Sequence, residues 1–263
     1  SEDAGQLAED WQMAAHRAGN AREAVVVFTR PPEVDAQSKQ LHRHGAFLRE
    51  LARRCLRAAH GCQRADLVVV GDLGGIPLPP GARILPQRGE SASERFLQAL
   101  RDVASLGYER IAAVGTDIAG LSSGLLDRAF AKLEGGRDMV LGPAADGGAY
   151  LVGLRTEALS ALQEMPWGTS QVLESLLANH PGAYVLERQL SDVDGQSTLR
   201  RLTACHLLPH TLAALARELG TCPQLVSLYP SPVRRGRQPA PIRQVQWRGP
   251  PVSCPDTRPG HAA

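Results

Sequence analysis

Four aspartates follow runs of strand length, where their carboxylates could bind a metal ion or a substrate. Asp117 and Asp146 each follow an apolar run of strand length, and Asp192 and Asp194 follow the last such run. Removing a carboxylate from water costs free energy unless it is paired, so the core gives no reason for these residues. Carboxylate oxygens bind Mg²⁺ and Mn²⁺, and such an ion neutralises a departing diphosphate. The pattern predicts a divalent-metal site, with helix capping and turn formation as the simpler alternative.

The sequence around these aspartates predicts strands that alternate with helices. Apolar runs predict strands at residues 24–28, 67–70, 83–85, 110–114, 138–141, 149–154 and 184–187. Apolar spacing and capping residues predict helices at 5–18, 38–60, 91–105, 122–133, 169–178 and 197–219, the last interrupted at Pro209. The predicted fold is α/β, with a mostly parallel sheet covered by helices on both faces and 149–154 running back. Ligands of such sheets bind beyond the carboxyl ends of the strands, where the four aspartates fall.

The composition fits one domain with a proper core. The chain has 263 residues, of which 43% are hydrophobic, and we expect one domain over 1–220 with a helical extension at 1–22. Residues 221–263 are rich in Pro and Arg and are expected to form a flexible tail. The five cysteines are widely spaced without a CxxC pair, which predicts reduced thiols.

Charge and hydropathy narrow the classes of partner. A net charge of +2 gives no reason to expect binding to nucleic acid. No run approaches the 18 apolar residues of a membrane span, and the first residues lack a signal-peptide pattern. We therefore expect a cytoplasmic protein.

Five short motifs occur in the order and spacing of one bacterial protein family. They are Gln87-Arg88-Gly89 with Glu94-Arg95, Gly115-Thr116-Asp117, the segment 142–154 (GPAADGGAYLVGL), Pro166-Trp167-Gly168-Thr169 with Val172-Leu173-Glu174, and Ser191-Asp192-Val193-Asp194. From Val25 to about Leu202 the sequence resembles the radical-SAM-associated transferases of glycosyltransferase-A-type fold. That family is similar to the guanylyltransferases that activate phospholactate and the molybdenum cofactor. The resemblance implies a nucleotide-diphospho-sugar transferase fold.

The resemblance also implies roles for individual residues. Asp117 and Asp146 would be catalytic, and Asp117 would share a metal ion with Asp194, for which Asp192 is the alternative. The nucleotide would be bound by Arg30, Gln87, Gly89 and Arg95. The acceptor side would be lined by Gly147, Gly148, Trp167 and Thr169. For Trp167, packing in the core is an equal alternative.

The chain departs from the family in its phosphate-binding loop. The family pattern F-A-K-x-P-x-P-G-x-x-K-T-R-L has a glycine and a Lys/Arg pair that fall here on Asp35, Ser38 and Gln40. Basic residues at those positions would grip phosphates, so the cradle is weakened. Arg30, or Lys39 one residue out of register, could substitute. Gly120 also replaces the second aspartate of the family's G-[ST]-D-C-P-D-L motif.

Three functions remain open on these residues. The first is glycosyl transfer from a nucleoside diphosphate sugar to a small acceptor, with Mg²⁺ or Mn²⁺. The second is nucleotidyl transfer to a phosphorylated small molecule, which the weakened cradle disfavours because a triphosphate needs more positive charge around it. The third is a non-catalytic binding or scaffold homologue, supported by the altered loop and opposed by the retained Asp117, Asp146 and Asp194.

Overall fold

The structure is a computed structural model that describes residues 22–163, 165–205 and 207–218. The chain divides into two units, Ser1–Leu225 and Val226–Ala263, and every described residue belongs to the first. The helix expected at 5–18 and the tail expected from 221 lie outside the described residues. Within the described part, no helix is long and apolar enough to cross a membrane.

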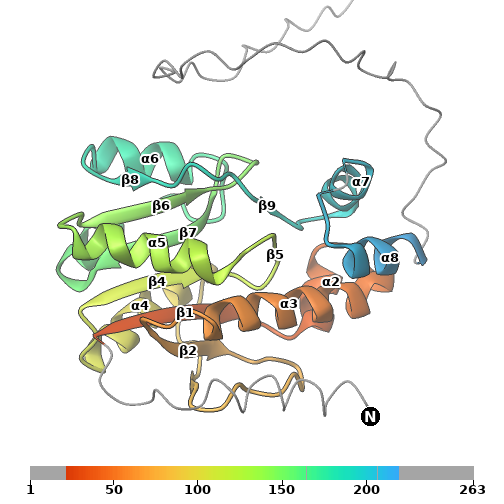
Figure 1. The fold of residues 1–263 in the computed structure, drawn as a ribbon, viewed down its shortest axis with the longest axis horizontal. Coiled ribbons are helices and arrows are strands. Elements are labelled where there is room, and N and C mark those ends of the chain that lie inside the picture. Colours follow the sequence, from red (N-terminus) through yellow and green to blue (C-terminus); the bar gives the residue numbers. More distant parts are fainter. Residues whose placement is uncertain (1–21, 164, 206, 219–263) are drawn as a thin grey trace, which may run out of the picture. The chain divides into compact units, whose positions relative to one another are not determined.

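A seven-stranded sheet of order β3-β2-β1-β4-β7-β6-β8 forms the centre of this unit (Figure 1). Its strands are β1 (Glu23–Thr29), β2 (Asp66–Gly71), β3 (Arg83–Leu85), β4 (Arg110–Val114), β6 (Met139–Pro143), β7 (Ala149–Arg155) and β8 (Tyr184–Val185). Within this sheet, β7 pairs antiparallel with β4 and β6, and the other neighbours are parallel. The predicted mostly parallel sheet and the returning strand are both confirmed.

Helices cover both faces of the sheet. One face carries α3 (Gly45–His60) and α5 (Ser123–Glu134), and the other carries α4 (Ala92–Ser105), the 3-10 helix η2 (Thr156–Leu162) and α6 (Val172–Asn179). Along β1, Val25 and Val27 enter the first core while Ala24 and Val26 enter the second. Because both sides of the strand are buried, its sequence is apolar throughout rather than alternating.

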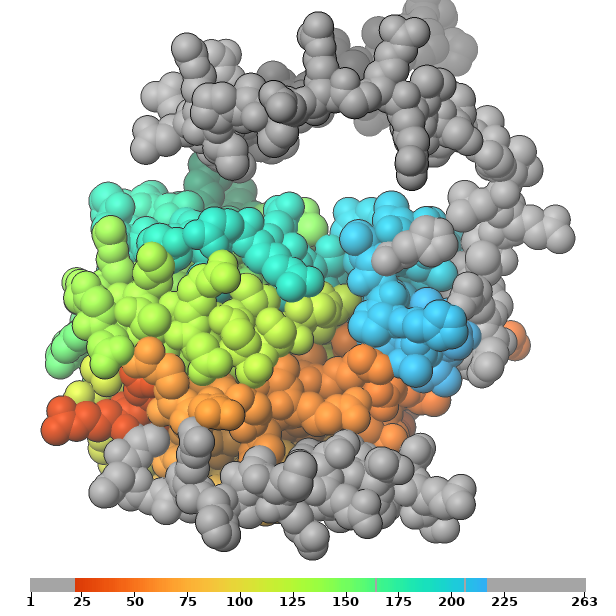
Figure 2. Space-filling model, viewed as in Figure 1, coloured from red at the N-terminus to blue at the C-terminus, as the bar shows by residue number. Residues whose placement is uncertain are grey.

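A third core joins distant parts of the chain at one end of the sheet. Its helices are α2 (Pro32–Ser38), the first turns of α3, α7 (Gln196–Ala204) and α8 (His210–Glu218), and the 3-10 helix η1 (His42–His44) joins α2 to α3. Phe47, Leu199 and Leu212 are fully buried in it. Figure 2 shows the blue α7–α8 segment seated against the orange α2–α3 segment. This packing brings the chain beyond residue 190 back beside α2.

The predicted helix at 38–60 is wrong at its start. α2 ends at Ser38, and the chain reverses at Gln40, whose φ is 56°, before α3 begins at Gly45. The N–H of Leu41 donates to the carbonyl of Ala36 at 2.7 Å, and the N–H of Gln40 donates to that of Gln37 at 3.1 Å. These two bonds form a Schellman motif, which usually has glycine at the left-handed position. Because glutamine does not mark a helix end as glycine does, the predicted helix extended through this break between α2 and α3.

The cysteines of the described residues agree with the sequence-based prediction. Cys55, Cys62 and Cys205 are free thiols, and the other two lie outside the described residues. Burial raises the pKa of the Cys55 thiol to about 12. Such a thiol stays protonated and is unreactive at neutral pH.

Candidate functional site

A small antiparallel ladder draws the aspartates together. β5 (Ile118–Ala119) directly follows Asp117 and pairs with β9 (Ser191–Asp192). The N–H of Val193 donates to the carbonyl of Asp117 at 2.9 Å, which fixes the segment after β9 beside the end of β4.

The same segment is also held to the turn between β6 and β7. The N–H of Ala145 donates to the carbonyl of Leu190 at 2.8 Å, and the N–H of Leu190 donates to that of Pro143 at 3.2 Å. Asp146 in this turn therefore lies beside Asp192. Backbone pairing on both sides brings three separate parts of the sequence to the carboxyl end of the sheet.

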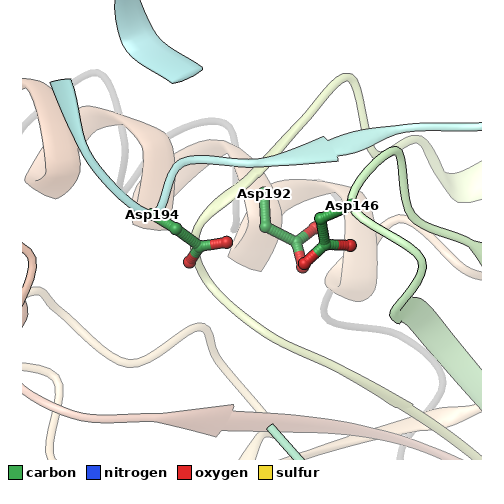
Figure 3. Close-up of side chains that lie close together, drawn as sticks. All are labelled: Asp146, Asp192 and Asp194. Carbon is green, nitrogen blue, oxygen red and sulfur yellow. The ribbon is translucent and has the colours of Figure 1, made fainter. Parts of the chain in front are cut away.

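Asp146, Asp192 and Asp194 form an acidic cluster in which each offers one oxygen within 4.8 Å of the others (Figure 3). Asp146 Oδ1 accepts a hydrogen bond from the N–H of Gly148 at 2.9 Å. Asp192 Oδ1 is buried and has no hydrogen-bond partner among the described residues. A buried polar atom without a partner costs free energy, and a proton or a cation at this oxygen would remove that cost.

The electrostatics of the cluster point the same way. Burial raises the pKa of Asp192, and the neighbouring Asp117, Asp194 and Asp146 add to this effect, bringing it to about 8. Burial also raises the pKa of Asp194, although Lys39 opposes the rise. Three carboxylate oxygens around one point are a donor set that suits a hard divalent cation. The residues therefore fit the Mg²⁺ or Mn²⁺ ion implied by the sequence.

An ammonium group lies between Asp117 and Asp194. Lys39 directly follows α2, and its Nζ forms ion pairs with Asp117, with Asp35 Oδ2 at 3.1 Å and with Asp194 Oδ1 at 3.5 Å. Burial lowers the pKa of Lys39, but Asp117 and Asp35 outweigh burial and raise it above its usual range. Lys39 is therefore charged at every physiological pH.

Asp117 and Asp194 thus face the same lysine, whereas Asp194 meets Asp146 and Asp192 directly. Asp192, predicted as the alternative to Asp194, lies in the cluster together with it. From the sequence, Lys39 was expected only as a substitute phosphate contact, and Asp35 only as a departure from the family's phosphate-loop pattern. Their i,i+4 spacing was the signal that could have paired them.

The second loop cation is also held by a carboxylate. Arg30 Nε donates to Asp35 Oδ1 at 2.7 Å, and a terminal nitrogen of Arg30 donates to Ser38 Oγ at 2.7 Å. Asp35 is 8% exposed and receives Arg30 on one oxygen and Lys39 on the other. Asp35, at the position where the family pattern has glycine, thus pairs with both remaining cations, Arg30 and Lys39, while Ser38, at the lysine position, only accepts a hydrogen bond from Arg30.

The residues predicted to bind the nucleotide make contacts of their own. The Gln87 amide donates to the carbonyls of Thr29, at 2.7 Å, and Val70, at 3.3 Å, which ties together the ends of β1 and β2. Arg95 donates to the carbonyl of Glu90 at 2.8 Å. Their role in binding the nucleotide stays a prediction.

Two separate cavities flank these groups. One of about 510 Å³ is lined by Gly89 together with Arg88, Gln98 and Arg101. The other, of about 470 Å³, is lined by Lys39, Gln40 and Asp194. Gly89 and Asp194 therefore line different cavities.

Gly147 and Gly148, two of the predicted acceptor residues, follow Asp146 in its turn, and Ser170 lies against Gly147. A Cβ on Gly147, whose φ is 94°, would lie 2.4 Å from the carbonyl oxygen of Ser170. Trp167 packs against Phe96 with ring centroids 4.7 Å apart, and its Nε1 donates to the carbonyl of Leu162 at 3.3 Å. Thr169 Oγ1 donates to the carbonyl of Pro166 at 2.8 Å. These contacts favour the packing interpretation of Trp167, while the glycine lets the 166–170 turn approach the site.

Comparison with known proteins supports the fold. Residues 49–169 match the sequence model of a family described as "Uncharacterized protein conserved in bacteria (DUF2064)". This stretch includes Asp117 and Asp146 and ends before Asp192 and Asp194. No curated protein matches the chain in sequence.

Solved structures extend the likeness over most of the chain. A Desulfovibrio desulfuricans G20 protein, provisionally named a nucleotide-diphospho-sugar transferase, aligns with a TM-score of 0.63 at 22% identity, covering 76% of this chain and 95% of that one. A cytidylyltransferase from Leptospira borgpetersenii serovar Hardjo-bovis gives 0.47 at 10% identity, covering 76% and 92%. A CMP:2-keto-3-deoxy-manno-octonic acid synthetase complexed with CTP gives 0.44 at 13% identity, covering 74% and 99%. The first alignment confirms the expected glycosyltransferase-A-like fold.

Proposed function

We propose that this protein is a metal-dependent transferase that acts on a nucleotide-activated donor. The proposal rests on the cluster of Asp146, Asp192 and Asp194 at the carboxyl end of the sheet. In this cluster the buried Asp192 Oδ1 has no hydrogen-bond partner among the described residues. A buried carboxylate oxygen without a partner does not stabilise a hydrophobic core, whereas a divalent cation would pair with it. In open α/β sheets, ligands bind at the carboxyl ends of the strands, where this cluster lies.

Asp146, Asp192 and Asp194 would hold the Mg²⁺ or Mn²⁺ ion. When bound, the ion supplies positive charge to the donor's phosphates and to the diphosphate that departs. Among the described residues, the loop cations Lys39 and Arg30 add little to that charge, because both are already paired with carboxylates. We therefore expect weak nucleotide binding when the metal is chelated.

A diphosphate donor fits this charge balance better than a triphosphate. A triphosphate carries more negative charge into a site whose own cations are engaged, so we favour glycosyl transfer from a nucleoside diphosphate sugar. In that reaction the bond from the sugar to the diphosphate breaks, and a bond from the sugar to an acceptor oxygen forms. Asp146, exposed beside Gly147 and Gly148, would take the proton that the acceptor hydroxyl loses.

A thermal-shift screen tests the proposal. Nucleoside diphosphate sugars and nucleoside triphosphates are each added with Mn²⁺ or with chelator. We expect a rise in melting temperature with the sugar nucleotide and Mn²⁺ together, absent in Asp192→Asn. The matched control Asp138→Asn changes an exposed aspartate outside the cluster and should keep the shift.

The screen separates the alternatives. A shift with nucleoside triphosphates but not with sugar nucleotides would favour nucleotidyl transfer. Release of pyrophosphate on adding a phosphorylated acceptor would then indicate that reaction. Nucleotide binding without turnover would favour a binding homologue. Absence of any metal-dependent shift would overturn the proposal.

A further inference from the structure

Lys39 occupies the position of a cation. Its Nζ meets carboxylates of Asp35, Asp117 and Asp194, and its side chain is only 9% exposed. Three carboxylate oxygens around one positive centre are the arrangement that a hard metal ion also takes in proteins. This centre adjoins the Asp146–Asp192–Asp194 cluster, because Asp194 belongs to both.

The position of this ammonium is built into the fold. Lys39 is the residue directly after α2, one turn beyond Asp35, and the Schellman motif at Gln40 ends the helix there. Asp35 is itself fixed, since its other oxygen accepts from Arg30 at 2.7 Å. Lys39 is therefore held toward the carboxylates from both ends and is not a mobile surface lysine.

We propose that Lys39 is a resident cation that fills a second cation position and limits this site to one divalent ion. The inference rests on the proposed function, because it takes the first ion to bind Asp146, Asp192 and Asp194. With the ammonium in place, a second ion beside Asp117 would meet a like charge at short range. Without it, Asp35, Asp117 and Asp194 would present three free carboxylate oxygens to a metal.

The sequence offers a matched pair of variants for the test. The chain contains two lysines, Lys39 and Lys132. Lys132 lies on α5 with its Nζ 4.3 Å from the ring centroid of Tyr184, outside the site. Lys39→Met removes the charge while keeping a side chain of similar length, and Lys132→Met makes the same change elsewhere.

Equilibrium dialysis and electron paramagnetic resonance with Mn²⁺ alone measure the outcome on the full chain. We expect one Mn²⁺ per chain for the wild type and Lys132→Met. Lys39→Met should bind two, with the spin coupling of neighbouring ions. One ion in Lys39→Met would overturn the role of Lys39 and leave the proposed function standing. Two ions in the wild type would also overturn it. No ion in the wild type would instead overturn the metal site and the proposed function.

A second measurement needs no variant. Amine-reactive labelling followed by mass spectrometry compares the two lysines in the same molecule. Lys132 should react, whereas Lys39 should stay protected both in chelator and after Mn²⁺ loading. Labelling of Lys39 that appears on Mn²⁺ loading would show that the ion displaces it, and would overturn the inference even if Lys39→Met fails to fold.

Discussion

Asp192 combines burial with negative neighbours. Its pKa rises from 3.8 to about 8, first because burial disfavours the charged form and then because Asp117 and Asp194 lie close by. The folded protein therefore keeps this proton to a higher pH than the unfolded chain. Between about pH 4 and pH 8 the folded state binds more protons, so the contribution of Asp192 to stability falls as the pH rises.

Replacing Asp192 by Asn should remove this loss. In chelator, the wild type should melt at a lower temperature at pH 8 than at pH 5, and Asp192→Asn should show a weaker dependence and a higher melting temperature at pH 8. Mn²⁺ should stabilise the wild type at pH 8 and leave the variant unchanged. Thermal unfolding followed by circular dichroism checks this, with Asp138→Asn as control. Parallel pH profiles for wild type and Asp192→Asn would contradict the electrostatic interpretation.

The end of α2 is the element that sets Lys39 in place. Gln40 has a φ of 56°, in the left-handed region. This conformation costs free energy for any residue that has a Cβ, whereas glycine adopts it readily. We expect Gln40→Gly to stabilise the protein by roughly 0.5–1 kcal/mol, after allowance for the greater freedom of glycine in the unfolded chain.

Gln37 provides the matched control for this prediction. It lies inside the same helix, so Gln37→Gly should destabilise the protein by roughly 0.5–1 kcal/mol. Urea unfolding of both variants measures the two signs. Destabilisation by Gln40→Gly equal to that of Gln37→Gly would mean that the helix does not end where the structure places its end.

The elements also show what the sequence could and could not predict. The main strands were predictable, because strands buried on both faces need continuous apolar runs such as Val25–Val27. β5 and β9 were not, since two-residue strands have no periodicity and depend on backbone pairing across more than seventy positions. That pairing sets Asp192 and Asp194 beside Asp117, and the hydrogen bonds of Ala145 and Leu190 set them beside Asp146. The sequence predicted that carboxylates gather at the carboxyl end of the sheet and paired Asp117 with Asp194, but it did not predict the cluster of Asp146 with Asp192 and Asp194.

Among the described residues, α8 is the last element of the chain that contributes buried side chains to a core. The buried members of the three cores lie between Ala24 and Ala216. Truncation after residue 220 should therefore change the free energy of unfolding by less than about 1 kcal/mol. Truncation after Leu208 removes Leu212 and Ala216 from the third core and should cost at least about 2 kcal/mol. Urea unfolding compares them, and a large loss on the first truncation would show that residues beyond 220 pack on the domain.

We propose that Asp146, Asp192 and Asp194 bind one divalent ion while Lys39 holds the neighbouring position. Anomalous diffraction at the manganese edge, from crystals of the full chain grown with Mn²⁺, can locate each ion. We expect one anomalous peak, from an ion bound by oxygens of these three aspartates at about 2.0–2.2 Å, with Lys39 still paired to Asp117. A peak between Asp117 and Asp194 with Lys39 displaced, or no peak at saturating Mn²⁺, would contradict this proposal.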